Sequence, residues 1–125
     1  MGRGIVRENI VLEKSKKFAV RIIKLYTYLC EERKEFVLSK QILRSGTSIG
    51  ANIRESCNAQ SGKDFINKMN IALKEADETM YWLEIMQESG ILTSIEIETI
   101  YLEAKEIAKL LTSIIKTKKR YLDNQ

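Results

Sequence analysis

Apolar residues recur at intervals of three and four along nearly the whole 125-residue chain, and no proline interrupts them. In an α-helix this spacing places apolar side chains on one face, which is then buried. The pattern predicts helices over residues 8–33, 36–57, 62–88 and 93–119. The apolar stripes of these four stretches are Phe18, Ile22, Leu25, Tyr26 and Leu29; Ile42, Ile49 and Ile53; Phe65, Met69, Ala72, Ala76, Leu83 and Met86; and Ile97, Ile100, Ala104, Ile107, Leu111 and Ile114.

Local capping patterns place the ends of the last two helices. Ser61 followed by Asp64 resembles a capping box, and Thr93 with Glu96 is the standard form of that motif. Gly90 suits the left-handed residue that ends a helix. Because connections of three to six residues force successive helices to be antiparallel neighbours, we expect one domain spanning all 125 residues. The predicted fold is all-α, an up-down-up-down antiparallel four-helix bundle.

The stretch RSGTSIGANIRES, residues 44–56, is rich in small residues and differs from the Leu, Ile, Lys and Glu around it. A phosphate-binding loop would need a preceding strand and a Lys-Ser or Lys-Thr pair, and neither is present. Gly46 and Gly50 instead keep a helical spacing. Each glycine costs a helix interior about 0.5–1 kcal/mol relative to alanine. The stretch therefore indicates close packing against another helix, from the same chain or from another subunit.

The segment SIGANIRES, followed by KDFINKMNIALKEADETMYWLEIM, resembles the four-helix bundle proteins encoded in intervening sequences of bacterial large-subunit (23S) ribosomal RNA genes. The likeness covers nearly the whole chain, and one departure is Ser56, where that family often has glycine. The matching residues are Ser48, Ile49, Asn52, Ile53, Glu55, Asp64, Phe65, Ala72, Glu75 and Glu84.

The resemblance implies a homopentamer with no established enzymatic activity, in which the matching residues have structural roles. The chain is also similar to the accessory proteins of diversity-generating retroelements. Those proteins are basic pentameric barrels that bind nucleic acid and a reverse transcriptase.

The chain lacks the residues that several classes of function require. The chain has no histidine, and Cys30 and Cys57 fit no metal-binding or redox spacing, so we expect no metal, no cofactor and no catalytic set. Glu75 has no histidine beside it, as a di-iron bundle would require, and is expected to have a structural role, either pairing with Arg54 or bonding across helices. No apolar run approaches the roughly 20 residues that span a bilayer, and the N-terminal MGRGIVRENI lacks a secretory signal. We expect a cytoplasmic protein with no membrane contact.

Charge is unevenly divided between the two ends of the predicted bundle. Residues 1–24, 44–74 and 105–125 form one end and hold 18 basic and 6 acidic residues. Residues 25–43 and 75–104 form the other end and hold 3 basic and 11 acidic residues. A clustered positive charge attracts phosphates through the release of counterions.

The basic end predicts binding of RNA or DNA, with Tyr121 as an aromatic side chain that could stack on bases. The other aromatic residues are expected to pack in the core or at a subunit interface. The alternative is a scaffold or accessory protein whose acidic end recruits a protein partner without binding nucleic acid. The candidate nucleic-acid-binding residues are Lys14, Lys16, Lys17, Arg21, Lys24, Lys116, Lys118, Lys119 and Arg120.

Overall fold

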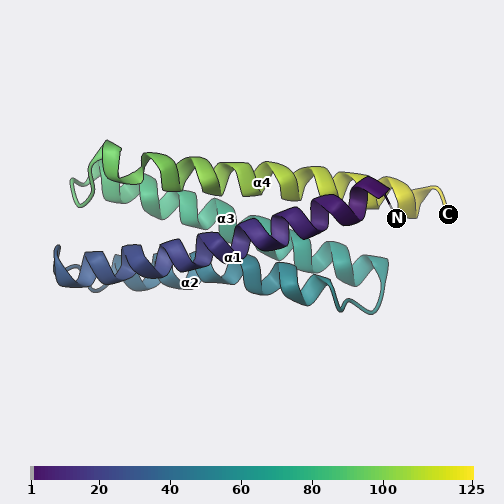
Figure 1. Cartoon of the computed structure of the whole chain (residues 1–125), viewed down its shortest axis with the longest axis horizontal. Helices are drawn as coiled ribbons and strands as arrows, with labels where there is room; N and C mark the ends of the chain where they lie inside the picture. Colours follow the sequence, from purple (N-terminus) through teal and green to yellow (C-terminus); the bar gives the residue numbers. More distant parts are fainter. Residues whose placement is uncertain (1) are drawn as a thin grey trace.

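The computed structural model describes residues 2–125, with side chains described from residue 6 onward. Four helices follow one another in antiparallel order, and no strand occurs among these residues (Figure 1). Each helix packs against its neighbours in sequence, and the first helix also packs against the last. This arrangement confirms the predicted all-α bundle. The helices are α1 (Gly2–Glu31), α2 (Leu38–Ser56), α3 (Gly62–Glu88) and α4 (Ser94–Asp123).

The core runs the length of the bundle and contains the predicted apolar stripes. Every residue of those stripes is buried except Tyr26, which is partly exposed. Five polar residues are buried with them, and each is a small serine or threonine whose hydroxyl can bond within the bundle. The largest fully buried side chains are Phe18, Ile22, Leu29, Ile42, Ile49, Ile53, Met69, Leu83, Met86, Leu92, Ile107 and Leu111.

Two helices are longer than the apolar pattern predicted, and one is shorter. α1 begins at Gly2 and not at residue 8, and α4 continues from residue 119 to Asp123. The last turn of α4 packs on the start of α3, where a Cβ on Gly62 would lie only 2.7 Å from Leu122 Cδ2. α2 begins at Leu38 and not at residue 36, so the loop before it includes two exposed apolar residues.

The predicted helix ends have the expected chemistry, with one difference. Thr93 and Glu96 form a complete capping box at the start of α4. Gly90 has a φ of +81°, as a left-handed residue after α3 requires. Ser61 accepts a hydrogen bond from the Asp64 backbone N–H, but the Asp64 carboxylate accepts from the N–H of residue 60. The shorter aspartate therefore completes a variant of the box one residue upstream.

The small residues of α2 pack on helices of the same chain. A Cβ on Gly46 would lie 2.7 Å from Ile22 Cγ1, and a Cβ on Gly50 would lie 3.2 Å from the Ser15 hydroxyl, so both glycines face α1. On the α3 side, the buried Thr79 hydroxyl donates to the Ser45 hydroxyl over 2.9 Å. The small-residue face of α2 therefore packs on α1 and α3 of its own chain.

Both chain termini and the α2–α3 loop lie at one end of the bundle, and the α1–α2 and α3–α4 loops lie at the other (Figure 1). The first end combines the segments that hold 18 basic and 6 acidic residues, and we call it the basic end. The opposite end, which holds 3 basic and 11 acidic residues, is the acidic end. The topology therefore separates charge along the long axis of the molecule.

Candidate nucleic-acid interface

The structure divides the nine candidate basic residues into two groups along the bundle. On α1, Lys14 bonds to Glu106 and Arg21 bonds to Glu103, which places these candidates beside the middle of α4. Lys116 lies about 15 Å beyond Glu106 along the α4 axis, at the helical rise of 1.5 Å per residue. The α1 and α4 candidates therefore do not form one continuous patch.

The α4 group lies at the tip of the basic end. Lys116, Lys119 and Arg120 are exposed, and none of them takes part in an ion pair within the described chain. Lys118 is partly buried, with its Nζ 5.3 Å from the centroid of the Phe65 ring and 5.5 Å from that of Tyr121. Tyr121 is 58% exposed. This group offers free cations and one accessible aromatic ring to a ligand.

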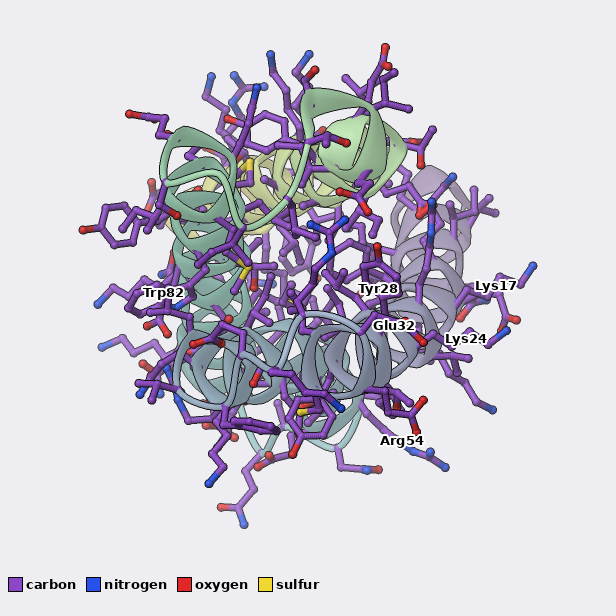
Figure 2. The ribbon with its side chains drawn as sticks, turned by 90° about the vertical axis from the view of Figure 1, so that its left-hand side faces the viewer. Lys17, Lys24, Tyr28, Glu32, Arg54 and Trp82 are labelled. Atoms are coloured by element: carbon purple, nitrogen blue, oxygen red, sulfur yellow. The ribbon has the colours of Figure 1, made fainter. Side chains whose placement is uncertain are left out.

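The α1 group is divided between paired and free cations. Lys14 and Arg21 are neutralised by carboxylates of α4. The other three, Lys16, Lys17 and Lys24, are exposed, and Lys17 and Lys24 extend away from the bundle on the outer side of α1 (Figure 2). Four exposed apolar side chains also occur along α1, two before these lysines and two between Lys17 and Lys24, so its outer face mixes charge with apolar surface. They are Val6, Ile10, Val20 and Ile23.

A ladder of polar contacts joins α1 to α4, and we call it the α1–α4 seam. Its α1 members are spaced by seven residues, which returns each one to the same face of the helix. Its members are Arg7 with Ser113 and Thr117, Lys14 with Glu106, Arg21 with Thr99 and Glu103, and Tyr28 with Glu96. The sequence reasoning missed Arg7, although its seven-residue spacing from Lys14 and Arg21 was a visible signal.

The end of the seam at the acidic end forms a network between two loops. The Tyr28 hydroxyl donates to Glu96 over 2.7 Å, and the Arg33 guanidinium donates to Glu96 over 2.9 Å and to the Ile91 carbonyl over 3.0 Å. The pKa of Glu96 lies below its ordinary value because the Thr93 backbone N–H and the Tyr28 hydroxyl donate to its carboxylate. Arg33 is therefore held as a structural cation that ties the α1–α2 loop to the α3–α4 loop.

Glu75 pairs with a different arginine from the one predicted. It lies 3.3 Å from Arg44, and Glu78 bonds to the same guanidinium. The prediction of Arg54 was wrong because α2 and α3 are antiparallel, so Arg54 lies about 15 Å farther along α2 towards the basic end. Burial raises the pKa of Glu75, and the charge of Arg44 opposes this shift. The contact joins two helices.

The other residues of the SIGANIRES stretch make local and interhelical contacts. The Ser48 hydroxyl donates to the Arg44 carbonyl, and the Asn52 amide donates to the Ser48 carbonyl over 2.9 Å. Ile53 is buried in the core, and Glu55 accepts from Lys68 of α3 over 3.2 Å. These contacts hold α2 in place, and none of them gathers groups around a substrate.

The remaining residues of the predicted signature lie on α3. Asp64 stabilises the start of the helix, and Phe65 is buried beneath Lys118. Glu84 accepts a hydrogen bond from the Tyr101 hydroxyl over 2.8 Å, which raises the pKa of Tyr101. These side chains stabilise the bundle.

Two further observations concern the described residues as a whole. None of their helices has a stretch both long enough and apolar enough to cross a bilayer. In the same part of the chain, no three His, Cys, Asp or Glu side chains come together in an arrangement that could hold a metal ion.

Known proteins are similar to this chain in sequence and in architecture. A family model described as 23S rRNA-intervening sequence protein matches residues 7–113. A crystal structure from Bacteroides thetaiotaomicron, described as a protein with unknown function from the S23 ribosomal protein family, is 61% identical in sequence, with a TM-score of 0.87. That comparison covers 88% of this chain and 98% of the other. A comparison with curated proteins gave no match.

Proposed function

The chain belongs to the 23S rRNA-intervening sequence protein family, and from this premise we propose that it is a non-enzymatic, oligomeric four-helix bundle that binds nucleic acid through its basic end. The separation of charge along the bundle is the observation that supports this proposal most. The family description refers to 23S rRNA, which makes RNA the first probe.

The free cations at the tip of the basic end are the groups best suited to phosphate. Lys116, Lys119 and Arg120 are exposed. The phosphates of a polyanion can therefore replace the water and the counterions around these cations. Each phosphate that a cation neutralises releases condensed counterions, which makes the affinity fall as salt rises. Lys14 and Arg21 are already neutralised, so we assign them a smaller part in binding.

We predict that the double substitution Lys116→Gln and Lys119→Gln weakens binding of a labelled single-stranded RNA at low salt. Loss of two phosphate contacts reduces the slope of log affinity against log salt by about one for each contact. Filter binding over a salt series measures both quantities.

A matched control removes two exposed lysines from the acidic end, Lys34→Gln with Lys40→Gln. This variant has the same net charge as the Lys116 and Lys119 double variant, so equal losses in both would mean that the basic end has no special part. Absence of RNA and DNA binding by the unsubstituted protein at low salt would contradict the proposed function itself.

The proposed self-association is supported by the outer face of α1. Val20 is 50% exposed and Ile23 is 48% exposed, and Val6 and Ile10 are also exposed on this helix. Val20 and Ile23 lie one helical turn apart, and exposed apolar patches mark protein contact sites in many soluble proteins. We propose that a second copy of the chain covers this face, in a homopentamer or another closed ring.

We expect light scattering at micromolar concentration to give several times the 14.4 kDa mass of one chain. The substitution Val20→Glu with Ile23→Glu should shift the mass towards that of a monomer, because each carboxylate would have to be buried without a partner. The control Ile95→Glu changes an apolar residue on α4 that is even more exposed, at 83%, and should leave the mass unchanged. A monomeric unsubstituted protein would contradict the proposed assembly.

One observation favours the alternative of a protein-recruiting scaffold. The loop between α1 and α2 presents Phe36, 53% exposed, and Val37, 70% exposed, at the acidic end. Exposed apolar residues at an end that holds 3 basic and 11 acidic residues suit a basic protein partner. If the chain binds no nucleic acid at low salt, this surface becomes the first one to test.

A further inference from the structure

The α1–α4 seam changes its chemistry at the level nearest the basic end. At the other three levels, a cation or a tyrosine of α1 meets a carboxylate of α4, which is Glu106, Glu103 or Glu96. At the level of Arg7 no carboxylate is present. The guanidinium instead donates to the hydroxyls of Ser113 and Thr117.

Arg7 and Arg21 occupy equivalent positions, which makes the missing carboxylate clear. Moving back two heptads from Arg21 gives Arg7, and moving forward two heptads from Thr99 and Glu103 gives Ser113 and Thr117. The hydroxyl of Thr99 is thus replaced by another hydroxyl, whereas the carboxylate of Glu103 is replaced by the hydroxyl of Thr117. On α4, Arg7 therefore meets a serine and a threonine at the positions where Arg21 meets a threonine and a glutamate.

The donors around Arg7 are incompletely used. A guanidinium has five N–H donors, and two of those of Arg7 donate to the two hydroxyls. Its Nε is buried and has no acceptor within the described chain. Ser113 and Thr117 donate no hydrogen bond to any described residue, whereas the neighbouring Thr112 donates to the Ala108 carbonyl. Both hydroxyl protons are therefore free to bond to an added acceptor.

More positive charge lies within one helical turn of this site. Lys109 precedes Ser113 by one turn, Lys116 follows it, and Arg120 follows Thr117, and all three cations are exposed. Residues 1–5 contain no carboxylate that could neutralise Arg7. The site thus combines a half-buried guanidinium, two free hydroxyl donors and an excess of positive charge.

We propose that Arg7, Ser113 and Thr117 form a seat for a phosphate group, whose oxygens take the place that the Glu103 carboxylate occupies beside Arg21. Serine and threonine hydroxyls and the arginine guanidinium are among the groups that bond to phosphate oxygens in nucleic-acid complexes. The identification of the occupant as a backbone phosphate of RNA or DNA rests on the proposed function. The seat itself requires only an oxyanion.

The first experiment titrates the unsubstituted protein with inorganic phosphate at constant ionic strength and follows the side-chain ¹⁵Nε signals of its arginines by NMR. The Arg7 signal should shift and saturate. The Arg21 signal is an internal control and should stay in place, because Glu103 already occupies the equivalent position. Equal responses of the two arginines, or no response of Arg7, would overturn the seat.

Two variants then distinguish specific binding of phosphate at the seat from general attraction between the basic end and a negatively charged ligand. Ser113→Ala with Thr117→Val keeps every charge and should lower RNA affinity about tenfold, the effect of losing hydrogen bonds to a charged group. Thr117→Glu restores the carboxylate of the seam and should abolish the phosphate response of Arg7. Its thermal unfolding should remain cooperative, because Glu103 makes the same contact beside Arg21.

The outcomes distinguish this inference from the proposed function. RNA binding that is unchanged in the Ser113 and Thr117 double variant, with no phosphate response of Arg7, overturns the seat and leaves the proposed function standing. A selective phosphate response of Arg7 in a protein that binds no RNA or DNA supports the seat and overturns the proposed function. Loss of affinity in the double variant, together with a phosphate response, supports both.

Discussion

Replacing Gly46 with alanine is expected to lower the free energy of unfolding by about 2 kcal/mol. The added Cβ would lie 2.7 Å from Ile22 Cγ1 and 2.8 Å from Ile22 Cγ2, well inside contact distance. Ile22 is fully buried and β-branched, so its side chain has essentially one conformation within a helix and cannot turn aside. The steric cost therefore exceeds the gain of up to about 1 kcal/mol that alanine usually gives a helix interior.

Urea unfolding followed by circular dichroism measures this change, and Gly62→Ala is its matched control. A Cβ on Gly62 would also approach a side chain to 2.7 Å, but the atom it meets is Leu122 Cδ2, the free end of a flexible and partly exposed side chain. We expect Gly62→Ala to change stability by less than about 0.5 kcal/mol. A Gly46→Ala protein as stable as the unsubstituted one would show that α1 and α2 can separate without cost.

The second large effect is expected from Glu35→Ala, which should destabilise the bundle by about 2 kcal/mol. The Glu35 carboxylate accepts hydrogen bonds from the backbone N–H groups of Val37 and Leu38, at 3.1 Å each, and of Ser39, at 2.7 Å. α2 begins at Leu38, and the residue at its N-cap, Val37, makes no side-chain capping bond. Glu35 therefore satisfies the amide groups that a capping residue would normally serve.

The effect of Glu35 should depend on pH. Burial acts to raise the pKa of the Glu35 carboxyl, but the N–H groups of Leu38, Ser39 and Val37 outweigh it, and the net pKa lies below the ordinary value. A carboxyl with a lowered folded-state pKa stabilises the fold above its unfolded pKa of about 4.3 and loses this contribution as pH falls through the folded value. The stability difference between the two proteins should thus be full at neutral pH and shrink in acid.

Urea unfolding at pH 7 and at several acidic pH values tests both statements. Glu32→Ala is the control, since Glu32 is an exposed carboxylate three residues earlier with no hydrogen bond to its side chain within the described chain. Its substitution should change stability by less than about 0.5 kcal/mol at any of these pH values. An equal loss in both variants would mean that general charge, and not capping, explains the role of Glu35.

Contacts between residues close in sequence were the most predictable. The capping box of Thr93 and Glu96 and the left-handed Gly90 follow from short-range patterns, and the structure has both. The cap on α2 escaped prediction because Glu35 lies outside the helix and reaches forward to it, which matches no capping-box spacing. The later start of α2 was missed for the same reason, because the Glu35 carboxylate caps the backbone N–H groups of residues 37–39 from outside the helix.

Contacts between helices were predictable in kind but not in partner. The sequence indicated that Gly46 packs closely on something and that Glu75 bonds across helices, and both statements hold. Choosing Ile22 and Arg44 as the partners requires the axial register of neighbouring helices, which apolar periodicity leaves free. For the same reason, the ion pairs of Lys14 and Arg21 with carboxylates of α4 could not be predicted from the sequence.

The common location of the two chain ends matters for anyone who prepares this protein (Figure 1). An affinity tag or a fused fluorescent domain on either terminus would sit beside Lys116, Lys119 and Arg120, where it would obstruct or mimic a ligand. Cys57, which is exposed in the α2–α3 loop, would direct a thiol-reactive dye to the same end. A tag-free protein with Cys57→Ser and Ser89→Cys would instead place the dye at the opposite end of the bundle.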